Sequence, residues 1–110
     1  MLSKCMTGVI ATFAFGALAA GNVLAQDTVK IGLIISMTGQ QASTGKQIKA
    51  AVDLYMKENG DTVAGKKVQV IIKDDGAVPD NSKRLAQELI VNDKVQFLAG
   101  FGVTPAALAV

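Results

Sequence analysis

The spacing of hydrophobic positions changes several times along the chain, and each change predicts a new element. Residues 29–36 (VKIGLIIS) are almost continuously apolar at their centre, which is typical of a strand covered on both faces in a parallel sheet. Residues 67–73 mostly alternate between apolar and polar side chains, and residues 95–99 form a third short apolar run. The pattern therefore predicts three strands.

Between these runs the apolar spacing becomes helical. Residues 46–58 place one apolar face opposite a charged one, and the Asn-Gly pair at 59–60 is a typical helix end. The apolar face consists of Ile48, Ala51, Val52, Tyr55 and Met56. Capping residues at 79–82 begin a second helix that continues to about residue 92. Thr104 is predicted to be the N-cap of a third helix, with Pro105 in its first turn.

The predicted order is strand, helix, strand, helix, strand, helix. This alternation indicates an α/β fold with a parallel, doubly wound sheet. In such folds ligands bind beyond the carboxyl ends of the strands. Three strands are too few to bury both faces of such a sheet, so we expect the chain to be part of a longer protein.

The first 25 residues have the layout of a secretory signal peptide. Lys4 precedes an uncharged, apolar run over residues 5–20, and small side chains follow, with cleavage expected after Ala25. An uncleaved membrane anchor is the alternative, but the run is about 16 residues long and a span needs about 20. We therefore expect residues 26–110 to be a mature periplasmic chain.

Composition excludes several kinds of site. The net charge of the 110-residue chain is only +2, without a basic stripe, which argues against a nucleic-acid surface. Histidine is absent and Cys5 is the only cysteine, so neither a Cys/His zinc site nor a cysteine–histidine nucleophile can be built. We expect no cofactor and no metal.

The loop after the first strand carries the main candidate residues. Residues 39–46 (GQQASTGK) resemble a phosphate-binding P-loop, but five residues separate the glycines, and Gln47 replaces the magnesium-binding hydroxyl. A better interpretation is a site for a small polar or anionic ligand, because four hydroxyls lie near a strand end and a helix N-terminus. These belong to Ser36, Thr38, Ser43 and Thr44. They could instead only cap the helix and the turn.

The loop over residues 100–105 follows the same logic. Its glycines, including Gly102, let the backbone approach a ligand, Phe101 could stack on it, and Thr104 could donate a hydrogen bond. Phe101 could equally belong to the core. The adjacent carboxylates at residues 74–75 form either a turn or an acid/base pair, and turn formation is favoured because adjacent side chains diverge.

The whole mature sequence, about residues 28–110, resembles the start of a branched-chain amino acid (Leu/Ile/Val-type) binding protein of an ABC transporter. Three segments after the secretion signal carry the resemblance: VKIGLIISMTGQQASTGKQIKAAVDLYMKENG, KVQVIIKDDGAVPDNSKRLAQELI and VQFLAGFGVTPAALA. Their combination of S-x-T-G, a helix-opening glycine, a D-D turn and a Gly-rich third loop is specific, although each motif alone is not.

The resemblance implies a type I periplasmic-binding-protein fold with two α/β lobes, of which this chain is the N-terminal part of the first. It also implies a small-molecule solute held between the lobes, an ABC permease as partner, a monomeric full-length protein and no enzymatic activity. Residues 36–44 and 100–104 match the family's cleft loops, and Thr104 with the N–H groups behind it would hold a carboxylate.

Two departures leave the identity of the ligand open. The third loop has one hydroxyl where amino-acid-binding members have several, and residues 39–40 are Gly-Gln where those members often have Gly-Pro. Amides, urea and aromatic carboxylates are also bound within the family. The alternatives are the ligand-sensing ectodomain of a receptor or regulator with the same lobe, and a secreted α/β enzyme.

Overall fold

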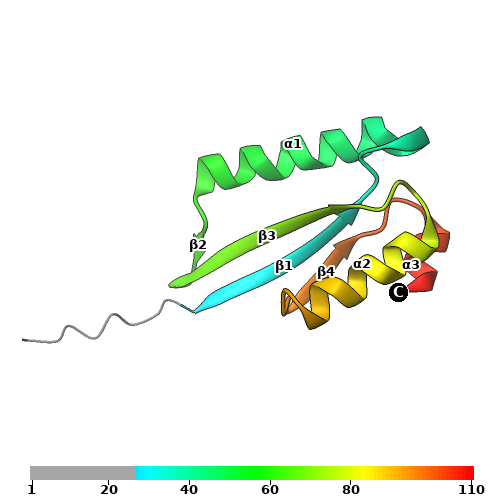
Figure 1. The fold of residues 1–110 in the computed structure, drawn as a ribbon. Helices are drawn as coiled ribbons and strands as arrows, with labels where there is room; N and C mark the ends of the chain where they lie inside the picture. The colour runs from blue at the N-terminus through cyan, green and yellow to red at the C-terminus, as the bar shows by residue number, and fades with distance from the viewer. Residues whose placement is uncertain (1–26) are drawn as a thin grey trace, which may run out of the picture.

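The computed structural model describes residues 27–110, which form one four-stranded sheet with helices on both faces (Figure 1). In chain order the elements are β1 (Thr28–Ile35), the 3-10 helix η1 (Gly39–Gln41), α1 (Ala42–Asn59), β2 (Thr62–Val63), β3 (Lys66–Asp74), α2 (Pro79–Val91), β4 (Phe97–Gly100) and α3 (Thr104–Ala109). The signal peptide predicted for residues 1–25 lies outside the described residues. None of the helices within residues 27–110 is both long and apolar enough to cross a membrane.

The strand order is β2-β3-β1-β4, and β1 pairs in parallel with both β3 and β4. The predicted parallel sheet is therefore confirmed, with the most apolar strand at its centre. The sequence did not predict β2, which pairs antiparallel with β3. Two residues are too few to show a period, and a turn with positive φ at Ala64 and Gly65 brings β2 back onto β3.

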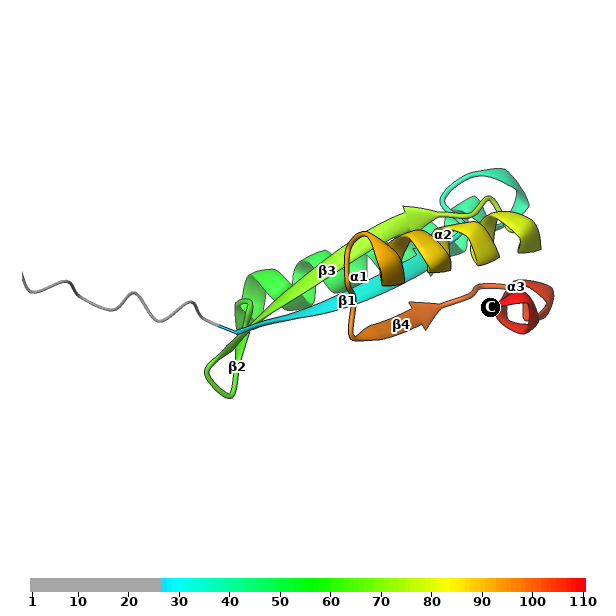
Figure 2. The same ribbon diagram turned by 60° about the horizontal axis from the view of Figure 1, so that its bottom comes forward.

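Successive residues of β1 face opposite sides of the sheet, and both sides are covered. Ile34 belongs to the buried cluster beneath α2, together with Leu85, Ala86 and Leu89. Ile71 packs against the same cluster, which explains why it interrupts the alternation of β3. Figure 2 shows α2 running along the sheet, and α3 packs against α2.

On the opposite face, α1 turns its predicted apolar side toward the sheet. Between them lies an open apolar hollow of about 450 Å³. It is lined by Ile31, Ile48, Ala51, Val52, Tyr55, Met56, Val68 and Val70. The five α1 residues are the five that the helical period selected, so that prediction is confirmed. Tyr55 stays 62% exposed, and the helix covers this face only in part.

Three helix starts differ from the sequence prediction. The N-cap of α2 is Val78, so the capping residues expected at 79–82 lie inside the helix. The loop expected before residue 46 contains η1 and the first turn of α1, because hydroxyl-bearing residues suit a helix N-terminus as well as a loop. Thr104 is the first residue of α3, and its N-cap is Val103, which makes no side-chain capping bond. The predicted N-cap was therefore wrong by one position.

Candidate functional site

The register of the sheet brings three loops together at one edge. Ile35 lies opposite Asp74 on β3, and Ile34 lies opposite Gly100 on β4. The strands β3, β1 and β4 thus end side by side. The segments that follow them, 36–38, 75–78 and 101–103, meet beyond the carboxyl edge of the sheet, where ligands bind in open α/β folds.

Asp75 is the centre of a buried hydrogen-bond network at this edge, although only 1% of its surface is exposed. Its Oδ1 accepts hydrogen bonds from the Ser36 hydroxyl at 2.6 Å and from the Ala77 N–H at 2.9 Å. Its Oδ2 accepts a hydrogen bond from the hydroxyl of Ser82, at 2.6 Å. Ser82 belongs to the first turns of α2, so one carboxylate joins the end of β1 to the start of α2.

Asp74 holds the same loop from the other side. Its Oδ1 accepts the N–H groups of Met37 at 2.8 Å and of Gly76 at 2.9 Å. The hydroxyl of Thr38 also bonds to this carboxylate. The two aspartates therefore form the turn that was predicted and, in addition, clamp the loop after β1, a long-range role that adjacent acidic residues do not reveal in a sequence.

Hydrogen bonding keeps both carboxyl groups ionised. Burial acts to raise the pKa of Asp75, but the three hydrogen bonds that it accepts outweigh burial and hold that pKa below its ordinary value. Burial likewise acts to raise the pKa of Asp74, and the bonds from Gly76, Thr38 and Met37 lower the net pKa. Both groups accept hydrogen bonds as carboxylates, so they favour the ionised form.

Acid should weaken this clamp. A pKa that is lower in the folded than in the unfolded state contributes stability that is present above the unfolded pKa, about 4. That stability is lost as the pH falls through the lower folded pKa. Urea unfolding of the full-length protein between about pH 6 and pH 3 should therefore show a falling free energy of unfolding, with a shallower fall in Asp75→Asn. Equal slopes in both proteins would contradict this prediction.

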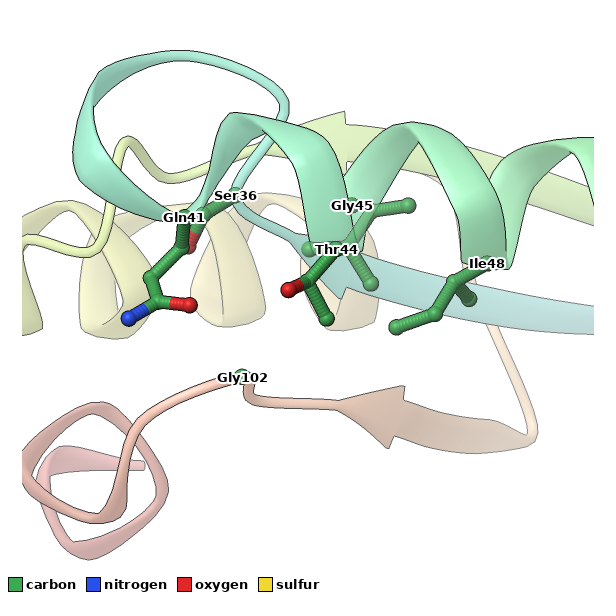
Figure 3. A pocket seen from close by; sticks show the side chains of 7 residues that line it. Ser36, Gln41, Thr44, Gly45, Ile48 and Gly102 are labelled. Atoms are coloured by element: carbon green, nitrogen blue, oxygen red, sulfur yellow. The ribbon is translucent and has the colours of Figure 1, made fainter.

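A small hollow lies beside the clamp, between the start of α1 and the loop after β4 (Figure 3). It is lined by Ile35, Ser36, Gln41, Thr44, Gly45, Ile48 and Gly102. Of the predicted ligand-binding residues, the structure brings Ser36, Thr44 and Gly102 together here. Gln41 was missed, because only the turn of η1 directs its amide to the side on which Thr44 lies, toward the loop with Gly102 (Figure 3).

The other predicted ligand contacts lie elsewhere. Thr38 is paired with Asp74, Ser43 is exposed in the first turn of α1, and Thr104 is exposed at the start of α3. None of these three lines the hollow beside Ser36. Their contacts with a ligand stay predictions.

Phe101 packs in the core, which is the second of the two roles that the sequence allowed for it. The ring packs against the buried cluster beneath α2. Its backbone has φ 62°, a left-handed conformation that is uncommon for a bulky residue, and its N–H donates to the Ile34 carbonyl at 2.8 Å. The ring thus anchors the loop that carries Gly102, and its predicted contact with a ligand stays a prediction.

Within residues 27–110 there is no group of three or more acidic, histidine or cysteine side chains able to hold a metal ion. The polar side chains around the hollow are the hydroxyls of Ser36 and Thr44 and the amide of Gln41. No buried side-chain nitrogen or oxygen in this part of the chain lacks a hydrogen-bond partner. Such a site can bind and orient a small polar molecule.

Comparison with known sequences identifies one family. The sequence profile of the family described as periplasmic binding protein matches residues 28–110. The Leu/Ile/Val-binding protein homolog 6 of Brucella abortus is 43% identical over 110 residues, which are 99% of this chain and 27% of that protein. The chain therefore spans about a quarter of the length of the curated relative that it matches.

Solved structures are similar in the same region. A solute-binding protein of an ABC transporter from Rhodopseudomonas palustris BisB5, in complex with 3,4-dihydroxybenzoic acid, is 73% identical with a TM-score of 0.74. A second from R. palustris, in complex with 4-hydroxybenzoate, is 44% identical with a TM-score of 0.72. Each comparison covers 76% of this chain and 23% of the other. Both relatives are solute-binding proteins of ABC transporters.

Proposed function

Because the chain belongs to the periplasmic binding protein family, we propose that it is the N-terminal part of the first lobe of a solute-binding subunit of an ABC importer. The complete protein works in the periplasm as a monomer, after cleavage of the signal peptide. It captures a small molecule between two lobes and delivers it to a membrane permease. No chemical step is involved.

One observation carries this proposal more than any other. The hollow beside Ser36 lies beyond the carboxyl ends of three parallel strands, and its walls come from the end of β1, from η1 and α1, and from the β4–α3 loop. It is too small to enclose a solute by itself. A second lobe that closes over this edge would complete the site and exclude water. Closure is then driven by the ligand's higher affinity for the closed form.

The solute is an aromatic carboxylic acid that carries a ring hydroxyl. The 73% identical relative was solved with 3,4-dihydroxybenzoic acid and the 44% identical relative with 4-hydroxybenzoate, which supports this class. The hydroxyls of Ser36 and Thr44 and the amide of Gln41 offer hydrogen bonds to such a ligand. A branched-chain amino acid is the second candidate, favoured by the similarity to the Leu/Ile/Val-binding protein homolog of Brucella.

Calorimetric titration of the complete protein decides between the two candidates. We expect 4-hydroxybenzoate to bind one molecule per protein, at least about tenfold more tightly than leucine, a difference of about 1.4 kcal/mol. Acetate serves as a control for nonspecific binding of a carboxylate. Tighter binding of leucine would replace the aromatic ligand by an amino acid, and binding of neither would contradict the proposed function.

A further inference from the structure

The hydroxyl of Ser36 has only one hydrogen, and the structure shows where it goes. Asp75 is a carboxylate and can only accept hydrogen bonds, so Ser36 is the donor in the 2.6 Å contact between Ser36 Oγ and Asp75 Oδ1. The Asp75 carboxylate also accepts from Ser82 and from the Ala77 N–H, and these bonds fix its orientation. The direction of the Ser36 hydroxyl is therefore set by its neighbours.

The same oxygen lies toward Gly102, which forms one wall of the hollow. Ser36 lines it together with Thr44 and Gly102, and a Cβ added to Gly102 would lie 3.9 Å from Ser36 Oγ. With its hydrogen committed to Asp75, Ser36 Oγ has only lone pairs left to offer on this side. A ligand oxygen without a hydrogen would face these lone pairs and be repelled, whereas an O–H or N–H group would be bound.

We propose that Ser36 accepts a hydrogen bond from a donor group of the ligand, and that Asp75 is the positioning residue that sets this direction. The inference rests on the proposed function and deepens it. The ring hydroxyl of the aromatic acid lies toward Ser36, and the carboxylate lies away from it. Asp75 thereby selects ligands that carry a donor on the side that faces Ser36.

The test compares two ligands that differ by one donor, 4-hydroxybenzoate and benzoate, by calorimetry on the complete protein. In the wild type, 4-hydroxybenzoate should bind more tightly. Ser36→Ala should weaken 4-hydroxybenzoate about fivefold, the value of one neutral hydrogen bond, and change benzoate less than about twofold. Thr62→Ala is the control, because it removes a hydroxyl that lies outside both the hollow and the Asp75 network. It should leave the ratio of the two dissociation constants unchanged.

Asp75→Asn provides a second variant of nearly the same volume. The Ala77 N–H donates to the same oxygen as Ser36, so the amide oxygen stays at that position and Ser36 still donates its hydrogen. The amide nitrogen then lies toward Ser82, whose hydroxyl can donate to the Val78 carbonyl instead. The preference for 4-hydroxybenzoate over benzoate should therefore persist. Equal losses for both ligands in Ser36→Ala, or a loss of the preference in Asp75→Asn, would overturn the inference alone. Failure of both ligands to bind the wild type would overturn the proposed function and the inference together.

Discussion

Alanine at Gly100 should destabilise the complete protein by about 3 kcal/mol or more, the sum of backbone strain and steric overlap. Gly100 has φ 107°, a conformation that side chains with a Cβ rarely adopt. A Cβ there would overlap the carbonyl oxygen of Ile34 and lie 2.9 Å from its carbonyl carbon. Ile34 belongs to the central strand and is fully buried, so its backbone cannot move aside.

Gly102→Ala is the matched control for this change. Gly102 lies two residues further along the same loop, does not have a positive φ, and has no atom closer to its added Cβ than Ser36 Oγ at 3.9 Å. Urea unfolding should show a stability for Gly102→Ala close to that of the wild type. If Gly100→Ala unfolds at the same urea concentration as Gly102→Ala, the close approach of β4 to β1 has been misinterpreted.

The second large effect is expected at Gly45, with a sign opposite to the usual one. Inside a helix, replacing glycine by alanine ordinarily stabilises by about 1 kcal/mol. Gly45 is buried in the first turns of α1, where a Cβ would overlap the carbonyl oxygen of Ser36 and lie 2.6 Å from its carbonyl carbon. We expect Gly45→Ala to destabilise by about 2 kcal/mol or more, because α1 must move away from the end of β1.

Lys46→Ala is the control for helix propensity, since Lys46 is exposed in the same turn. It should change the free energy of unfolding by only a few tenths of a kcal/mol. Binding of 4-hydroxybenzoate should weaken in Gly45→Ala and stay unchanged in Lys46→Ala, because Gly45 lines the hollow next to Thr44. A Gly45→Ala protein that is as stable as the wild type would show that α1 can shift without cost.

Both glycines contact the backbone at the end of β1, one from α1 and one from β4. Together with the two aspartates they fix the loop that carries Ser36 on three sides. A rigid loop is useful in a binding protein, because polar groups that are already oriented lose little entropy when the ligand arrives. Destabilising changes at these positions should therefore reduce affinity as well as stability.

The order of the elements and their apolar faces could be predicted from the sequence. The five apolar residues of α1 were found because a helical period of 3.6 residues is a local property of the chain. The parallel sheet followed from the alternation of strands and helices, and Asn59 with Gly60 marked the end of α1 correctly. The hydroxyl-rich loop after β1 was recognised as a candidate site because its residues are neighbours in sequence, so this pattern is also local.

The partners of those residues could not be predicted. Asp75 and Ser36 are separated by 39 positions, and only the parallel register of β1 and β3 brings them within hydrogen-bond distance. The same register places Thr38 beside Asp74. Phe101 packs against the buried cluster beneath α2, a contact that depends on where α2 lies on the sheet. Local sequence thus determined which segments form and which residues are candidates. Tertiary structure decided which candidates share the hollow, because contacts between distant segments depend on strand register and on helix packing.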